Sequence, residues 1–136
     1  MIYEFEVPGK ITGKGRPRVN TQTAIAYTPA KTKEYEDLVK QYFILKYRRI
    51  NPLEGRIRIQ IKAHFGIPKN ASKKQKEEML KNNISPVKKP DIDNIAKIIL
   101  DALNKLAFKD DNQIIKLDIE KVYSEEEKVY VKIEEY

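Results

Sequence analysis

Apolar and polar positions alternate in two stretches of the chain. Tyr3, Phe5 and Val7 alternate with Glu4 and Glu6, and this period of two residues predicts a strand with one buried face. The alternation returns over residues 56–65, where the apolar face is Ile57, Ile59, Ile61, Ala63 and Phe65. Basic side chains occupy much of the opposite face, so we expect one side of this second strand to be positively charged.

Helical spacing of apolar positions predicts three helices. The first runs from Lys31 to Lys46, and a short polar helix follows Ser72, which forms a capping-box signature with Gln75. The third and most regular pattern covers residues 94–106. Its apolar positions are Ile95, Ile98, Ile99, Ala102, Leu103 and Leu106.

The remaining segments predict strands and an arm. Residues 113–123 and 128–135 are predicted to be strands joined by a turn at Ser124–Glu127, with Leu117, Ile119, Val129, Val131 and Ile133 facing a core. GKGRPRVN at 13–20 is turn-rich and basic, and with residues 23–29 it predicts a hairpin or arm over the sheet. The element order favours an α+β fold, a mixed β-sheet with helices packed on one face.

Length and composition narrow the class of protein. A chain of 136 residues is too short for two separate cores, so we expect a single domain over 1–136. No apolar run reaches the roughly 18 to 20 residues that span a bilayer, and the N-terminus lacks a basic leader with an apolar stretch. We therefore expect a cytoplasmic protein without a membrane partner.

The types of metal site are limited as well. The chain has no cysteine and one histidine, His64, which excludes disulfides, thiolate catalysis, cysteine-ligated clusters and a multi-histidine site within one chain. A metal would have to be held by oxygen ligands.

Charge is distributed unevenly along the chain. There are 27 Lys and Arg against 20 Asp and Glu, a net charge of +7. Residues 1–90 carry 20 basic and 8 acidic side chains, whereas residues 91–136 carry 7 and 12. The basic part suits a polyanion such as nucleic acid, because Lys and Arg displace counterions from phosphates. The acidic part needs a separate explanation.

Two short segments offer that explanation. In KKPDIDNIAK at 88–97, Pro90 favours an extended backbone, so we expect Asp91 and Asp93 to point the same way. FKDDNQ at 108–113 adds Asp110 and Asp111. Carboxylates without competing histidines suit Mg²⁺, which prefers one or two carboxylates plus waters and substrate phosphate.

In a basic protein this set predicts metal-assisted phosphodiester hydrolysis. The metal would generate hydroxide and stabilise charge on the reacting phosphate, while Lys97 holds the attacking water or the scissile phosphate.

Ordinary structural roles are the alternative. Asp93 before an apolar helix is a good N-cap, Asp91 would suit the positive end of the helix dipole, and Asp110 and Asp111 have turn composition. Lys97 and Asp101 have the spacing of an i, i+4 ion pair.

The length of the third helix limits where Asp111 can lie. A helix over 94–106 is about 20 Å long, and the five residues from 106 to 111 span at most roughly 17 Å. Asp111 therefore cannot return to Asp93 in the same chain if that helix is complete. Either the helix ends near Leu103 and the chain doubles back, or the third carboxylate comes from a second subunit.

The same segments resemble the RusA family of Holliday junction resolvases, in the form found in phages and Gram-positive bacteria. GKGRPRVN (13–20) with YTPAKTKEYE (27–36) resembles the N-terminal block of the family. KPDIDNIAKIILDALN (89–104) with FKDDNQI (108–114) resembles its catalytic block, and the likeness spans nearly the whole chain.

The resemblance implies a Mg²⁺-dependent endonuclease, with Mn²⁺ as the alternative ion. It implies a homodimer that nicks four-way DNA junctions symmetrically in recombination and repair. By position, it implies that Asp91, Asp93 and Asp111 bind metal and that Lys97 is catalytic, with Asp110 as the alternative to Asp111. Before the first aspartate, Lys88, Lys89 and Pro90 replace the arginine run of some relatives.

Basic side chains outside the acidic segments are the candidates for phosphate contacts, with a solvated surface as the alternative for each. They are Lys14, Arg16, Arg18, Lys31, Lys33, Arg56, Arg58, Lys62, Lys88 and Lys89. Two other functions stay open: a less selective nuclease for flaps or branched DNA, and a non-catalytic nucleic-acid-binding protein.

Overall fold

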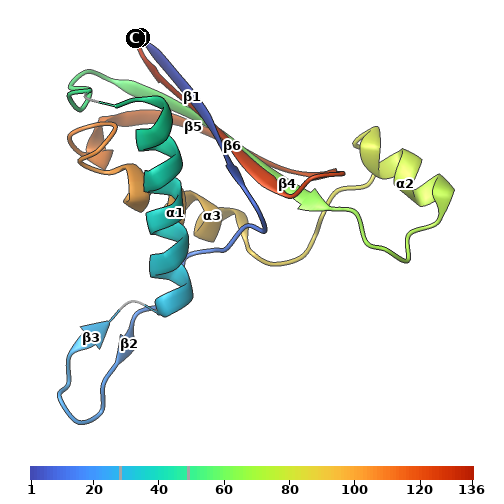
Figure 1. The fold of residues 1–136 in the computed structure, drawn as a ribbon, viewed down its shortest axis with the longest axis horizontal. Coiled ribbons are helices and arrows are strands. Elements are labelled where there is room, and N and C mark those ends of the chain that lie inside the picture. The colour runs from blue at the N-terminus through green and yellow to red at the C-terminus, as the bar shows by residue number, and fades with distance from the viewer. Residues whose placement is uncertain (28, 49) are drawn as a thin grey trace.

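A computed structural model describes residues 1–27, 29–48 and 50–136; Thr28, inside the N-terminal motif quoted above, and Arg49 lie outside the described residues. One four-stranded sheet has the order β1-β6-β4-β5 (Figure 1). Its strands are β1 (Ile2–Pro8), β4 (Ile57–Gly66), β5 (Ile114–Ser124) and β6 (Lys128–Glu135). β4 and β5 are parallel and the other neighbours antiparallel, which confirms the predicted mixed sheet.

Two helices cover one face of this sheet. α1 (Ala30–Lys46) and α3 (Ile92–Leu103) pack against each other and against the alternate residues of β4 that were predicted to face the core. Ile57, Ile59 and Ala63 are fully buried there, and each buried isoleucine contributes about 1.5–3 kcal/mol through the hydrophobic effect. The α+β prediction is confirmed, and the helices fix the positions of the segments beside them.

The third helix, α2 (Lys73–Leu80), lies beyond the end of β4 and away from α1 and α3 (Figure 1). The predicted capping box is present: the Gln75 amide donates to Ser72 Oγ at 3.1 Å, and the Ser72 amide donates to Gln75 Oε1 at 2.9 Å. Only Met79 of this helix is buried. The prediction of helices on one face therefore holds for α1 and α3 alone.

The N-terminal hairpin consists of β2 (Arg18–Val19) and β3 (Ala26–Tyr27). A hairpin was predicted, but the expectation that it lies over the sheet was wrong, because it projects away from the body (Figure 1). None of its side chains is buried, so no apolar contact holds it against the sheet.

α3 begins and ends earlier than the predicted 94–106. Asn104 has an extended backbone and Lys105 a left-handed one with φ 67°, which stops the helix at Leu103. Leu106 packs against the core from the loop that follows α3. Its apolar side chain at helical spacing is the reason that the predicted helix was too long at this end.

Leu117 was predicted to face the core but is 39% exposed. It lies on β5, which is an edge strand with a neighbouring strand on one side only. Within the described ranges, no helix is long and apolar enough to cross a membrane.

Candidate active site

A cleft of about 390 Å³ lies between the start of α3 and the segment that leads into the hairpin. It is lined by Lys14, Gly15, Arg16, Pro17, Asp91, Asp93, Asn94, Lys97 and Asp101. The cleft thus brings together the two motifs that were singled out separately in the sequence, GKGRP and DIDNIAK.

Backbone hydrogen bonds hold the GKGRP segment against the starts of both helices. The Lys14 amide donates to the Asn94 carbonyl at 2.9 Å, and the Gly15 amide donates to Oγ1 of the buried Thr32 at 3.0 Å. A Cβ on Gly13 would lie 2.6 Å from Pro90 Cβ, and one on Gly15 2.9 Å from Thr32 Oγ1. The two glycines therefore permit an approach that side chains would prevent.

Gly13→Ala is expected to destabilise the fold by about 1–3 kcal/mol, because the added methyl overlaps Pro90 and must displace the segment that carries Asp91. DNA cleavage by this variant should fall by more than its smaller fraction of folded protein explains. The matched control is Gly9→Ala, where φ is 98° but no atom lies within 4 Å of the added Cβ. That variant should lose about 1 kcal/mol through backbone strain and keep its activity when folded. Thermal unfolding and a cleavage assay would separate the two effects.

The side chains of Asp91 and Asp93 do not cap α3. Asp91 is the N-cap residue of α3, yet its side chain makes no capping hydrogen bond. Asp93 lies in the first turn of the helix and so is not part of an extended stretch. Over the part of the chain that the structure describes, neither carboxylate has a hydrogen-bond or ion-pair partner. The capping interpretation was wrong, and both side chains remain available at the cleft.

The helix itself favours negative charge at this place. Both aspartates lie at the N-terminal end of α3, where the helix dipole stabilises an anion by about 0.3–1 kcal/mol. Lys97 lies one turn further along the same wall of the cleft and is exposed. Among the described residues it forms no ion pair, so the predicted Lys97–Asp101 pair is absent.

Asp101 pairs instead with Lys14 from the opposite wall. Lys14 Nζ lies 3.1 Å from Asp101 Oδ2 and 2.5 Å from Oε1 of Glu36, a residue of α1. Burial alone would lower the pKa of the Lys14 ammonium, but its hydrogen bonds to Glu36 and Asp101 raise that pKa above the ordinary value. Lys14 therefore stays positively charged. Its two ion pairs hold the GKGRP segment to both α1 and α3.

The two lysines of the cleft are expected to differ when mutated. Lys97→Met should lower cleavage by about 100-fold and leave the free energy of unfolding within about 0.5 kcal/mol of wild type, because Lys97 stabilises no other side chain. Lys14→Met should lower stability by about 1 kcal/mol, because it leaves Glu36 and Asp101 unpaired. Urea unfolding and single-turnover cleavage would measure both. Unchanged cleavage by Lys97→Met would contradict a catalytic role.

Asp111 lies at the other end of the sheet. It opens a short 3-10 turn (Asp111–Gln113), and Gln113 Nε2 donates to the carbonyls of Leu53 and Gly55, just before β4 begins. Pro90, which precedes Asp91, lines a cavity with Phe65, where β4 ends. The ten residues of β4 span about 30 Å.

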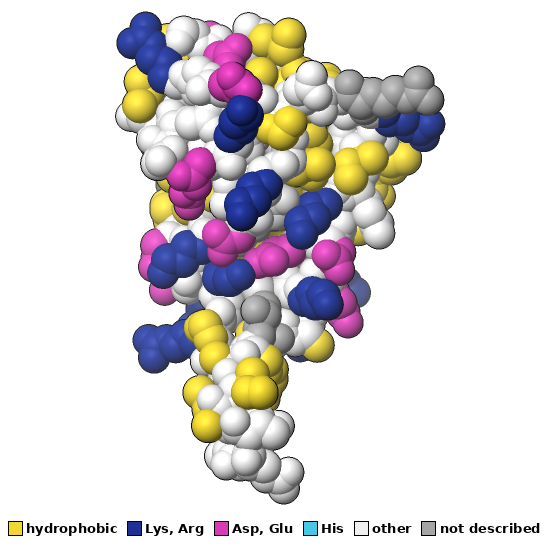
Figure 2. All heavy atoms as spheres, turned by 90° about the vertical axis from the view of Figure 1, so that its left-hand side faces the viewer, with side chains coloured by type: hydrophobic (Ala, Val, Ile, Leu, Met, Phe, Trp, Pro, Cys, Tyr) yellow, Lys and Arg dark blue, Asp and Glu magenta, His cyan; other side chains and the backbone are white. Residues whose placement is uncertain are grey.

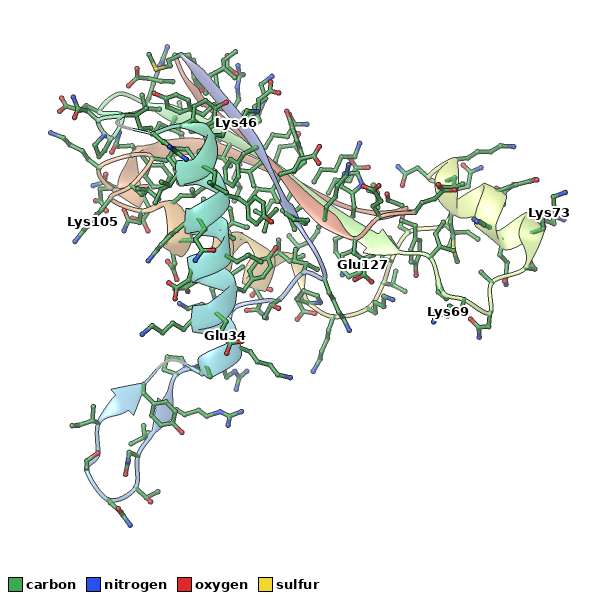
Figure 3. The ribbon with its side chains drawn as sticks, viewed as in Figure 1. Glu34, Lys46, Lys69, Lys73, Lys105 and Glu127 are labelled. Atoms are coloured by element: carbon green, nitrogen blue, oxygen red, sulfur yellow. The ribbon has the colours of Figure 1, made fainter. Side chains whose placement is uncertain are left out.

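Figure 3 illustrates the separation. Lys105, in the loop leading to Asp111, lies at the opposite end of the sheet from Glu127, which lines the cavity beside Pro90 (Figure 3). α3 does end at Leu103, but the loop then packs on Leu53 through hydrogen bonds and does not return to the cleft. In the described ranges no three acidic side chains gather into a metal site. Within one chain, Asp111 therefore does not join Asp91 and Asp93.

The two neighbouring aspartates of that loop have different surroundings. Asp110 caps the 3-10 turn: its Oδ1 accepts from the Asp111 amide at 3.0 Å, and its own amide donates to Gln113 Oε1 at 2.8 Å. The Asp111 carboxylate has no such partner among the described residues. The capping role of Asp110 leaves Asp111 as the freer of the two candidate ligands.

The candidate phosphate contacts fall into two regions. Lys14 and Arg16 line the cleft, and the others on the same side are Arg18 in the hairpin, Lys31 and Lys33 at the start of α1, and Lys88 and Lys89 beside Pro90. On the body above the projecting hairpin, basic and acidic side chains are interleaved (Figure 2).

The second region is the sheet face that α1 and α3 do not cover. Arg58 there pairs with Glu134 at 2.9 Å, and Arg56 Nε donates to the Tyr136 carbonyl at 2.9 Å. Lys62 alternates with the buried positions of β4 and faces the same way. The structure does not bring these three side chains to the cleft.

Sequence reasoning missed three residues that build the cleft. Glu36 holds Lys14, Thr32 anchors Gly15, and the carbonyl of Asn94 anchors Lys14. Glu36 and Thr32 lie on the first helix and have no spacing signal that relates them to residues 13–15. Two clues were available: the pair of glycines, which indicates close backbone packing, and the family resemblance, which groups residues 13–20 with residues 27–36 but gives Thr32 and Glu36 no role.

Comparison with known proteins identifies a family and a relative. The family model described as endodeoxyribonuclease RusA matches residues 8–134, nearly the whole chain. A protein of Bacillus subtilis (strain 168), uncharacterized protein YqaN, is 37% identical over 139 residues, covering 97% of this chain and 95% of the relative. The matched region includes the cleft and the loop with Asp111.

Proposed function

This chain belongs to the endodeoxyribonuclease RusA family, and from that membership we propose that it resolves four-way (Holliday) DNA junctions by paired symmetric nicks in recombination and repair. One observation carries the proposal. Asp91 and Asp93 face the same cleft as Lys97. Among the described residues, neither carboxylate has a hydrogen-bond or ion-pair partner. Two carboxylates and a lysine that share one cleft supply the groups that a divalent cation and a phosphate need.

The donor set of the cleft fits a hard divalent cation. Asp91 and Asp93 supply carboxylate oxygens at an exposed position, where water and substrate phosphate can complete the coordination of Mg²⁺. Mn²⁺ accepts the same oxygen ligands. When bound, the ion would activate water and neutralise charge that develops on the phosphate.

The remaining residues of the cleft would bind and orient the substrate. Lys97 would hold the scissile phosphate or the attacking water, and the exposed Arg16 would bind a phosphate on the opposite wall. Lys14 is held by two carboxylates, so its main task would be to fix the distance between the walls.

A homodimer would complete the site. Asp111 is unavailable to the cleft of its own chain, so a third carboxylate would have to come from a second copy; a two-fold dimer also suits two symmetric cuts in one junction. α3 and β5 carry exposed apolar side chains that a second copy would cover. These are Ile92 (47% exposed), Ile115 (57%) and Leu117 (39%).

The proposal is tested with a synthetic four-way junction and the matching linear duplex, each incubated with the protein and Mg²⁺ or EDTA. We expect paired symmetric nicks in the junction alone and none with EDTA. Equal cleavage of flaps and three-way junctions would support the less selective nuclease instead. Tight binding without cleavage under Mg²⁺ or Mn²⁺ would contradict the nuclease and support a binding protein.

A further inference from the structure

The hairpin of residues 18–27 exposes apolar side chains away from the core. Val19 is 60% exposed, Ile25 65% and Tyr27 49%. In Figure 2 hydrophobic side chains are grouped on this projection, which extends well clear of the body. Single exposed apolar residues are ordinary on a protein surface, but three on one small projection favour contact with a partner.

Local hydrogen bonds order the tip of the hairpin. The Asn20 amide donates to the Ile25 carbonyl at 3.0 Å, and the Ala24 amide donates to the Asn20 carbonyl at 2.7 Å. Asn20 Oδ1 also accepts from the amides of Gln22 and Thr23. The turn thus holds its shape without help from the core, and an ordered arm loses less entropy when it binds.

The strand register determines which side chains share a face. Arg18 pairs with Tyr27 across the hairpin, so their side chains project from the same face. Ile25 lies just before β3, two residues from Tyr27, and its carbonyl accepts from the Asn20 amide, which continues the hairpin pairing by one residue. In extended pairing, residues two apart face the same way, so Ile25 joins Tyr27 on this face. One face of the arm therefore combines an aromatic ring, an aliphatic side chain and a guanidinium, a combination suited to nucleic-acid bases and their phosphates.

Charge on and beside the arm points to the same partner. Residues 13–33 contain five basic side chains and no acidic one. Arg16 and Pro17 line the cleft, and the hairpin begins at the next residue. A molecule that contacts Tyr27 would thus extend directly into the cleft that holds Asp91 and Asp93.

We propose that this hairpin contacts DNA bases at the branch point, with Tyr27 and Ile25 against the base faces while Arg16 and Arg18 hold the flanking phosphates. The inference rests on the proposed function. When the arms of a junction are held apart, the base pairs at the branch point lose stacking on one face, whereas a linear duplex hides its base faces. Apolar side chains inserted at such steps are an established way to bind distorted DNA. The arm would therefore distinguish a junction from a duplex.

The test uses the Asp93→Asn background, so that binding is measured without cleavage. Tyr27→Ser with Ile25→Ser should weaken junction binding by about 5- to 150-fold, the equivalent of one lost stacking contact, and leave duplex binding nearly unchanged. The permanganate reactivity of thymines at the branch point should also be lower in the junction complex of this double variant than in the complex of the parent protein. Tyr27→Phe should retain both properties because it keeps the ring.

Leu45→Ser is the matched control, since Leu45 is 61% exposed on α1, and it should change neither property. All variants should unfold at the wild-type temperature, because the arm buries no side chain.

Three results would overturn the inference: equal weakening on junction and duplex, unchanged binding and reactivity, or dissociation of a dimer in sedimentation as the sole effect. The last would make the arm a contact between subunits. If the unmodified protein cuts no junction, the proposed function is contradicted instead. The failure of the hairpin inference and the failure of the proposed function can therefore be distinguished.

Discussion

Replacing Asp93 with Asn is expected to lower junction cleavage by at least about 100-fold while junction binding persists. Asn keeps the shape of the side chain but removes the charge that attracts a divalent cation. The structure separates this effect from folding, because the Asp93 carboxylate accepts no hydrogen bond from the described residues. Single-turnover cleavage, binding in a gel-shift assay and thermal unfolding would be measured on the same preparation.

Asp37→Asn is the control for this experiment. Asp37 is an exposed aspartate on α1 and does not line the cleft, so the substitution removes the same charge elsewhere. It should leave cleavage at the wild-type rate. If Asp93→Asn cleaves as fast as Asp37→Asn, the carboxylate has no part in catalysis and the metal proposal fails. A modest drop in stability confined to Asp93→Asn, without loss of activity, would limit Asp93 to a role in the helix dipole, worth about 0.3–1 kcal/mol.

The types of the main elements could be predicted from the sequence because each has a strong local signal. The alternation in β4 and the capping box at Ser72 are both set by neighbouring residues, and both predictions are confirmed. The end of α3 depended instead on the backbone of Asn104 and Lys105, which tertiary packing determines. An apolar residue such as Leu106 fits a helix or a loop equally well by spacing alone.

Long-range partners explain the rest of the differences. The i, i+4 spacing favoured Lys97 as the partner of Asp101, yet Lys14 reaches Asp101 from a segment more than eighty residues away. A surface ion pair of helical spacing contributes only about 0.2–0.5 kcal/mol, so a partner that also holds Glu36 easily replaces it. Motif spacing identified the candidate residues, but only the fold showed which of them lack a structural role.

The position of Asp111 leads to a mixing experiment. If a cleft takes Asp91 and Asp93 from one copy and Asp111 from the other, Asp93→Asn and Asp111→Asn are each inactive as homodimers. Their heterodimer contains one fully defective site and one site with every wild-type ligand. Random exchange of subunits should therefore restore about a quarter of the wild-type sites, and each would make a single nick.

The control mixture combines Asp91→Asn with Asp93→Asn. Both carboxylates come from the same copy, so neither site of that heterodimer is intact and no activity should return. Native mass spectrometry would verify that heterodimers form in both mixtures. Recovery confined to the mixture with Asp111→Asn, as single nicks without paired resolution, would require a site shared between two chains. No recovery in verified heterodimers would mean that Asp111 does not complete the cleft of its partner, and the carboxylate pair at the start of α3 would then have to bind the metal with water and phosphate alone.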